Sequence, residues 1–162
     1  MLIDLTYRCS MGCNHCMSDC KPNGADMTPE ILKDVLTFCK KNEVPNLIFS
    51  GGEMFENPHI LELLKIIEKE WDKRFPLSFI TNGRKLADTP DIFEAVQDMQ
   101  KKFGKKKIMI QVTDDPRFYP QPLSEKQKYR LQKLDAVIEG VPGNGNKCLY
   151  PQGRTLAVSY TH

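Results

Sequence analysis

The sequence predicts an α/β fold built on a parallel sheet, and three observations lead to that prediction. Short apolar segments alternate with segments of helical periodicity. Several of the helical segments begin with a capping residue followed by proline. After the first unit the strand starts recur about every 30 residues, as in β-α units joined by right-handed crossovers. We therefore expect a single α/β domain over residues 1–162, with an irregular tail from about residue 140.

Short apolar runs mark the expected strands, which we take to be buried in a parallel sheet. They cover residues 2–6, 47–50, 77–81, 108–113 and 136–138. Glycines and prolines then interrupt the pattern, and a candidate last strand at 155–159 is followed by no closing helix. The sheet should thus contain about five to six mostly parallel strands and be short or truncated at its C-terminus.

Helix starts are expected where a side-chain oxygen precedes a proline or faces a glutamine three residues later. The four sites are Thr28-Pro29, Asn57-Pro58, Thr89-Pro90 and the Ser124–Gln127 capping box. Apolar residues at helical spacing predict the buried faces. These residues are Ile31, Leu32, Val35, Leu36 and Cys39; Ile60, Leu63, Leu64, Ile67 and Trp71; Ile92, Phe93, Val96, Met99 and Phe103; and Leu131 and Leu134.

Charge and hydropathy exclude several classes of protein. With 23 Lys plus Arg against 21 Asp plus Glu, the formal net charge is +2, which argues against nucleic-acid binding driven by bulk charge. No apolar run reaches the roughly 20 residues that span a bilayer, and the first residues do not resemble a signal peptide. We expect a cytoplasmic protein, with the lysines at 101–107 forming a solvated surface.

Four cysteines lie close together on the loop that follows the first strand. They are Cys9, Cys13, Cys16 and Cys20. In a reducing compartment such a cluster favours metal binding over disulfides. Thiolates at Cys9, Cys13 and Cys16 can reach three irons of a [4Fe–4S] cluster and leave the fourth iron open to a substrate or cofactor.

Polar and glycine-rich segments also follow the next three strands. Ser50-Gly51-Gly52-Glu53 allows close backbone approach to a ligand and adds an anion suited to an ammonium group. Thr81-Asn82-Gly83 follows the third strand, and Gln111 and Thr113 end the fourth. Because loops at the carboxyl ends of parallel strands carry the chemistry of α/β proteins, these segments should meet the cysteine loop.

Together these segments resemble the radical S-adenosylmethionine (radical SAM) enzymes, whose signature is C-x3-C-x-aromatic-C. Here the motif is Cys9-x3-Cys13-x2-Cys16, with the ring of His15 before the third cysteine. The resemblance implies a partial (β/α) barrel in which the three cysteines hold a [4Fe–4S] cluster. It further implies that the reduced cluster cleaves SAM to a 5'-deoxyadenosyl radical, which abstracts hydrogen from a substrate.

The resemblance also implies the residues that contact SAM. Ser50, Gly51, Gly52 and Glu53 would hold the methionine amino group, and the backbone at His15 would contact adenine. Asn82 would face the SAM and substrate pocket. Gln111 or Thr113 would lie near the ribose or the carboxylate of SAM, and residues 137–140 would lie near adenine.

No substrate is named by the sequence. A peptide, a protein and a small metabolite all remain open, as does the subclass of oxidoreductase, lyase or transferase. The expected electron donor is a reductant such as flavodoxin or ferredoxin. Arg117, Tyr119 and Arg154 are candidate contacts to the substrate or to the SAM carboxylate.

Two alternatives stay open. Zinc bound by Cys13, Cys16, Cys20 and either His15 or Cys9 would make the loop structural, although the cysteine spacing lacks the usual two short pairs. A non-catalytic metal-binding module that retains the fold is the alternative of a different class. Cys20 is expected to lie near the cluster without ligating it, Cys39 to lie in the core, and Cys148 to be a buried thiol, an extra ligand or a substrate-facing group.

Overall fold

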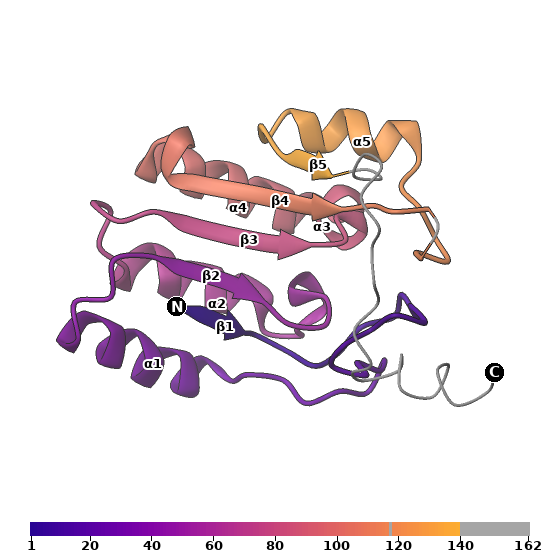
Figure 1. Cartoon of the computed structure of the whole chain (residues 1–162). Coiled ribbons are helices and arrows are strands. Elements are labelled where there is room, and N and C mark those ends of the chain that lie inside the picture. The colour runs from indigo at the N-terminus through magenta and orange to yellow at the C-terminus, as the bar shows by residue number, and fades with distance from the viewer. Residues whose placement is uncertain (117, 140–162) are drawn as a thin grey trace, which may run out of the picture.

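A computed structural model describes residues 1–116 and 118–139, which form one sheet with its helices (Figure 1). The strands are β1 (Leu2–Asp4), β2 (Leu47–Ser50), β3 (Leu77–Thr81), β4 (Ile108–Thr113) and β5 (Val137–Glu139). The helices are α1 (Pro29–Lys41), α2 (Ile60–Glu70), α3 (Arg84–Asp88), α4 (Pro90–Phe103) and α5 (Glu125–Gln132), with the short 3-10 turns η1 (Met54–Glu56) and η2 (Lys105–Lys107).

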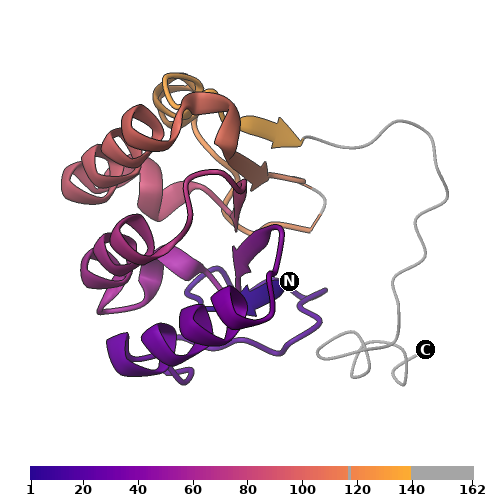
Figure 2. The same cartoon turned by 90° about the vertical axis from the view of Figure 1, so that its left-hand side faces the viewer.

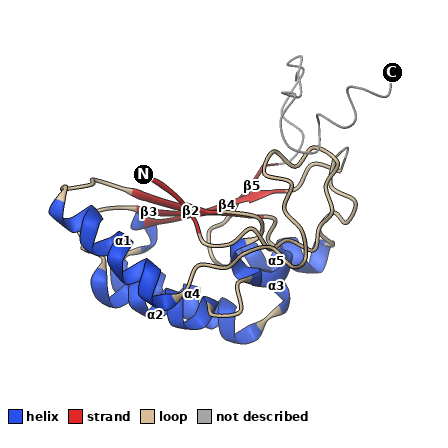
Figure 3. Cartoon of the chain, turned by 90° about the horizontal axis from the view of Figure 1, so that it is seen from below, coloured by secondary structure: helices blue, strands red, loops and turns tan. Residues whose placement is uncertain are grey.

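All five strands are parallel, and their spatial order β1-β2-β3-β4-β5 follows the chain. When every crossover has the same hand and moves to the next neighbour, the helices gather on one face. Figures 2 and 3 show this arrangement, with the helices on one side of the sheet. The sheet is not closed, which confirms the predicted α/β fold with a partial barrel.

Only one face of the sheet is buried among the described residues. Side chains alternate along the strands, so Phe49, Phe79 and Ile110 point into the helical layer and are almost fully buried. On the opposite face Leu2 is 61% exposed and Met109 is 56% exposed. The prediction of fully buried strands was therefore wrong, since no helix of the described chain covers this second face.

The predicted helix faces form the core, except that Val35 is only partly buried against it and Ile31 is exposed. The expected residues of α2, α4 and the segment around α5 are buried, and so are Leu32, Leu36 and Cys39 of α1. Ile31 is 50% exposed, because α1 buries Pro29 and Leu32 of its first turn and leaves the intervening position outside.

Two helix caps differ from the prediction. Thr28 caps α1, and Ser124 and Gln127 form the expected capping box of α5. Thr89 precedes Pro90 at the start of α4, but its side chain makes no cap hydrogen bond.

The prediction at Asn57 was wrong in a more informative way, since α2 begins at Ile60 without a side-chain cap. The Asn57 amide instead donates to the carbonyls of Leu5 (2.7 Å) and Met27 (3.0 Å). The Asn57 Oδ1 still accepts the His59 N–H (2.8 Å), so the side chain combines a local turn contact with a long-range one.

Several predictions fall outside the described residues. They concern Arg117, the candidate strand at 155–159, Cys148 and Arg154. Within the described ranges, no helix has the length and apolar character needed to cross a membrane.

Candidate cofactor site

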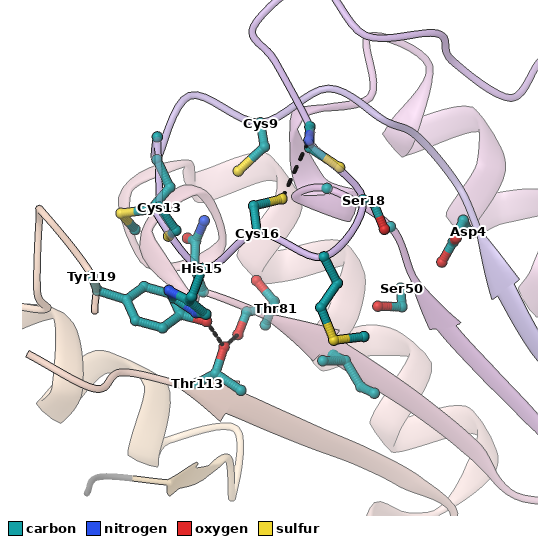
Figure 4. A pocket seen from close by; sticks show the side chains of 18 of the residues that line it. Asp4, Cys9, Cys13, His15, Cys16, Ser18, Ser50, Thr81, Thr113 and Tyr119 are labelled. Carbon is teal, nitrogen blue, oxygen red and sulfur yellow. Dashed lines mark hydrogen bonds between the residues drawn. The ribbon is translucent and has the colours of Figure 1, made fainter. Parts of the chain in front are cut away.

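A cavity of about 350 Å³ lies at the carboxyl ends of the strands, beneath the cysteine loop (Figure 4). It extends onto the open face of the sheet, because Leu2 and Ile80 belong to its wall. Among the described residues, the lining is Leu2, Asp4, Cys9, Met11, Gly12, Cys13, His15, Cys16, Met17, Ser18, Cys20, Ser50, Gly51, Gly52, Ile80, Thr81, Asn82, Thr113 and Tyr119. Segments that follow four different strands thus meet at one place.

The cysteine loop is fixed at its base by its own two strand-like ends. Tyr7 N–H donates to the carbonyl of Ala25 (2.7 Å), and Cys9 N–H donates to the carbonyl of Lys21 (3.0 Å). The Asn57 amide, which binds the carbonyls of Leu5 and Met27, draws the two ends together.

A charged network reinforces this base. The Arg8 guanidinium binds Asp26 through Nη2 (2.7 Å) and Nε (3.3 Å), and Thr6 donates its hydroxyl to the same carboxylate. The hydrogen bond and charge of Arg8 lower the pKa of Asp26, so the carboxylate is the form that holds the loop.

The thiols of Cys9, Cys13 and Cys16 are half-buried at the cavity, whereas Cys20 is only 3% exposed. Burial raises the pKa of the Cys9 thiol to about 11. The backbone N–H of Cys20 lies 3.2 Å from the Cys16 sulfur and donates to it. Three thiols of intermediate exposure in one cavity have the donor chemistry that an iron–sulfur cluster requires.

A single bound ion fits this loop less well. Zinc needs four donors at about 2.0–2.3 Å from one point. Within residues 1–116 and 118–139, no group of at least three Cys, His, Asp or Glu side chains is arranged to hold one metal ion. The cysteines of a cubane cluster bind separate irons, so their sulfurs need not converge on one point.

The glycines after β2 are required by the chain itself. A Cβ at Gly51 would lie 2.3 Å from the carbonyl oxygen of Thr6, and one at Gly52 would lie 2.3 Å from that of Arg8. Gly51 also has a φ of +133°, which side chains disfavour. The N–H groups of Gly52 and Glu53 donate to these same two carbonyls (2.7 and 2.8 Å). The glycines therefore let the cysteine loop dock against the end of β2.

Glu53 is fully buried and does not line the cavity. Its carboxylate accepts hydrogen bonds from the Thr81 hydroxyl (2.7 Å) and from the backbone N–H groups of Asn82 (2.7 Å) and Phe55 (3.1 Å). Burial raises its pKa to about 7, although these three bonds act in the opposite direction. In this arrangement Glu53 joins the end of β2 to the end of β3.

Aromatic rings form the wall on the β4 side. The His15 ring packs against Phe118 and Tyr119, with centroids 5.1 and 5.3 Å apart. The Tyr119 and Thr113 hydroxyls lie 2.7 Å apart in a hydrogen bond, as Figure 4 shows. Burial raises the pKa of Tyr119 to about 12 and lowers that of His15, so both rings favour their neutral forms.

Most of the residues predicted from sequence meet at this cavity, and two lie apart from it. The residues that line it are Cys9, Cys13, His15, Cys16, Ser50, Gly51, Gly52, Asn82 and Thr113. Gln111 shares the open face of β4 with Thr113 but is not part of the lining, and neither is Glu53. Asp4 was missed, although its position at the end of the first strand was a usable signal.

The fold and the cavity define a class of protein: an open α/β barrel with a cysteine-lined cavity at the carboxyl edge of its sheet. The sequence matches the family model of the Radical SAM superfamily over residues 3–141. The chain therefore belongs to the radical SAM superfamily of enzymes, as the sequence motifs predicted. For this family, a [4Fe–4S] cluster and SAM are the implied cofactors.

Three curated relatives align with part of the chain. The putative peptide biosynthesis protein YydG of Bacillus subtilis is 32% identical over 83 residues, which are 50% of this chain and 25% of YydG. The PqqA peptide cyclase of Streptomyces rochei is 35% identical over 40% of this chain and 18% of its own length. The antilisterial bacteriocin subtilosin biosynthesis protein AlbA of B. subtilis is 30% identical over 49% of this chain and 17% of its own length. The alignments thus span a quarter or less of these relatives.

Proposed function

We propose that this chain is the cofactor-binding core of a radical SAM enzyme that modifies a peptide. The observation that carries the proposal is the meeting of Cys9, Cys13 and Cys16 with Gly51 and Gly52 at one cavity within a radical SAM sequence. The peptide as substrate is supported by the names of the three relatives, each of which refers to a peptide or a bacteriocin.

In this proposal Cys9, Cys13 and Cys16 hold a [4Fe–4S] cluster, and Cys20 stays outside the ligand set. A bound cluster would supply the electron that splits SAM into methionine and a 5'-deoxyadenosyl radical. Because ligation needs thiolates, binding of the cluster must release protons from these cysteines.

The rest of the cavity binds and orients SAM. Ser50, Gly51 and Gly52 offer backbone groups to its methionine portion, and Glu53 holds this segment in place through Thr81 and Asn82. The His15 backbone would contact adenine, while the rings of His15 and Tyr119 exclude water from that side. Thr113 is better placed than Gln111 to reach SAM, because only Thr113 lines the cavity.

Electron paramagnetic resonance of the reconstituted, reduced protein tests this proposal. We expect a [4Fe–4S] signal whose shape changes when SAM is added, because SAM binds the open iron. A cluster whose spectrum ignores SAM, or a protein that takes up zinc alone, would instead support a non-catalytic metal-binding module.

Cysteine variants assign the ligands. Cys13→Ser should abolish cluster assembly, whereas Cys20→Ala and Cys39→Ala should retain the cluster signal. Cys39 is a matched control because it lies on the buried face of α1, away from the cavity. Retention of normal iron content by Cys13→Ser would contradict the assignment.

A further inference from the structure

Glu56 makes a two-point contact with the cysteine loop. It is the last residue of η1, three positions after Glu53, and it lies 46 residues from Ser10. One carboxylate oxygen accepts the Ser10 backbone N–H at 2.9 Å, and the other accepts the Ser10 hydroxyl at 2.6 Å. Both distances are within the range of strong, charge-assisted hydrogen bonds.

The contact falls at a sensitive place, because Ser10 directly follows Cys9. Neighbouring Asn57 ties the two ends of the same loop together at Leu5 and Met27. Successive residues of one short turn thus hold the base of the loop and the segment that carries its first cysteine.

Two hydrogen bonds to one residue fix its orientation as well as its position. A single bond would let Ser10 rotate about the contact, and the Cys9 side chain would turn with it. Ser10 itself is exposed, so packing supplies little restraint at this point. The η1 turn that carries Glu56 begins directly after Glu53, and the N–H of Glu53 is bonded to the carbonyl of Arg8.

We propose that Glu56 is a positioning residue: by clamping Ser10 it fixes Cys9 relative to the Gly51-Gly52 backbone. This role rests on the proposed function, in which Cys9 is a cluster ligand. Residues that orient metal ligands commonly change metal retention by about 10-fold or more when they are lost. Glu56 does not touch the reacting atoms, and nothing in the sequence motif requires it.

Two substitutions separate the clamp from the charge of Glu56. Glu56→Ala removes both hydrogen bonds. Glu56→Gln removes the charge and retains the clamp, since its oxygen can accept the Ser10 N–H while its amide donates to the Ser10 hydroxyl. Glu62→Ala is the matched control, because Glu62 is an exposed glutamate in the first turn of α2.

The first measurement uses the iron-free protein, so that it does not depend on the cofactor. Amide hydrogen exchange should be faster in Glu56→Ala for the peptide that contains Ser10, and close to wild type in Glu56→Gln and Glu62→Ala. Unchanged exchange in Glu56→Ala would overturn the clamp whether or not the protein binds a cluster.

The second measurement follows the loss of cluster absorbance after an iron chelator is added. We expect Glu56→Ala to lose iron about tenfold faster than wild type. The double variant Glu56→Ala/Ser10→Ala should lose iron only slightly faster than Glu56→Ala, because the two substitutions remove the same contact. Equal rates of iron loss in wild type and Glu56→Ala would overturn the role of Glu56 and leave the proposed function unaffected. If Glu56→Gln lost iron as fast as Glu56→Ala, charge would be the cause and the clamp would be rejected. If the wild-type protein formed no cluster, the proposed function would fail, and this role with it.

Discussion

The loops after β1 and β2 meet at the same cavity, yet they are held in place differently. The loop after β2 is anchored by Glu53, which is fully buried and bonded to Thr81, Asn82 and Phe55. The loop after β1 has no helix or strand between Leu5 and Thr28, and its contacts to Asp26 and Glu56 lie nearer to solvent.

This difference indicates that the two loops contribute differently to the stability of the fold. The end of β2 is held by buried hydrogen bonds, whereas the cysteine loop relies on a few polar contacts and leaves the thiols of Cys9, Cys13 and Cys16 half-exposed. Bound metal stabilises a loop of this kind by linking its thiolates. Substitutions at the end of β2 should therefore reduce the stability of the fold. Substitutions in the cysteine loop should mainly change its local opening and the retention of a cluster.

The largest loss of stability is expected for Glu53→Gln. The Glu53 carboxyl group is the neutral acid at pH 5, and its two oxygens face three donors. Both oxygens of the acid can accept a hydrogen bond, whereas the amide nitrogen of glutamine cannot, so Glu53→Gln leaves an N–H or O–H unsatisfied. We expect a loss of about 3 kcal/mol in the free energy of unfolding at pH 5, with weaker SAM binding, because buried unpaired groups are costly. Urea unfolding of the iron-free protein measures this loss. A change below about 0.5 kcal/mol in the free energy of unfolding would show that the structure at the end of β2 does not depend on Glu53.

The Glu53 effect should shrink as the pH rises. Burial raises the folded-state pKa of Glu53 from its ordinary value of 4.5 to about 7. The stability that this protonated group contributes is complete below pH 4.5 and is lost as the pH rises through 7. The wild-type protein should thus lose stability between these values by up to about 1.4 kcal/mol per pH unit relative to Glu53→Gln. Parallel pH profiles for the two proteins would contradict the assigned shift.

A smaller and more local effect is expected for Asp26→Asn. The substitution weakens the bonds to Arg8 and Thr6 at the base of the cysteine loop, at a cost of about 1 kcal/mol. Hydrogen exchange should increase over residues 6–28 while the amides of β2 and β3 stay protected. Asp98→Asn, in an exposed pair with Lys101, is the control. Equal loss of protection in the loop and the sheet would mean that the two regions unfold together.

Local patterns predicted the strands, most helix faces and the cysteine and glycine motifs, because each depends on residues that are close in sequence. The failures share a different cause. Asn57 matches a helix cap locally, and its Oδ1 accepts the His59 N–H, but α2 begins only at Ile60 and the Asn57 amide nitrogen binds carbonyls 52 and 30 residues away. Met109 has an apolar side chain in a strand, and its exposure depends on which face the helices cover.

The partners of Glu53 and Glu56 were likewise not predictable. A glutamate beside two glycines suggests a ligand contact, whereas the fold places Thr81 28 residues away within hydrogen-bond reach. The motif thus indicated which segments form the site, and only the packing of β2 against β3 showed which groups face the cavity.

The smallest effect is expected at the opposite end of the sheet, where the lysines of residues 101–107 lie. Lys102 pairs with Glu68 between α4 and α2, and Lys105 pairs with Asp135. Lys107 donates to the carbonyls of Lys73 and Arg74.

Such exposed contacts contribute little, so Lys102→Met should change the free energy of unfolding by about 0.5 kcal/mol or less, and salt should reduce the difference further. Iron retention should match wild type, because the site lies at the carboxyl ends of the strands. Faster loss of iron from Lys102→Met would show that the two ends of the sheet are coupled. The difference between the two loops would then depend on the helical layer as well as on their own contacts.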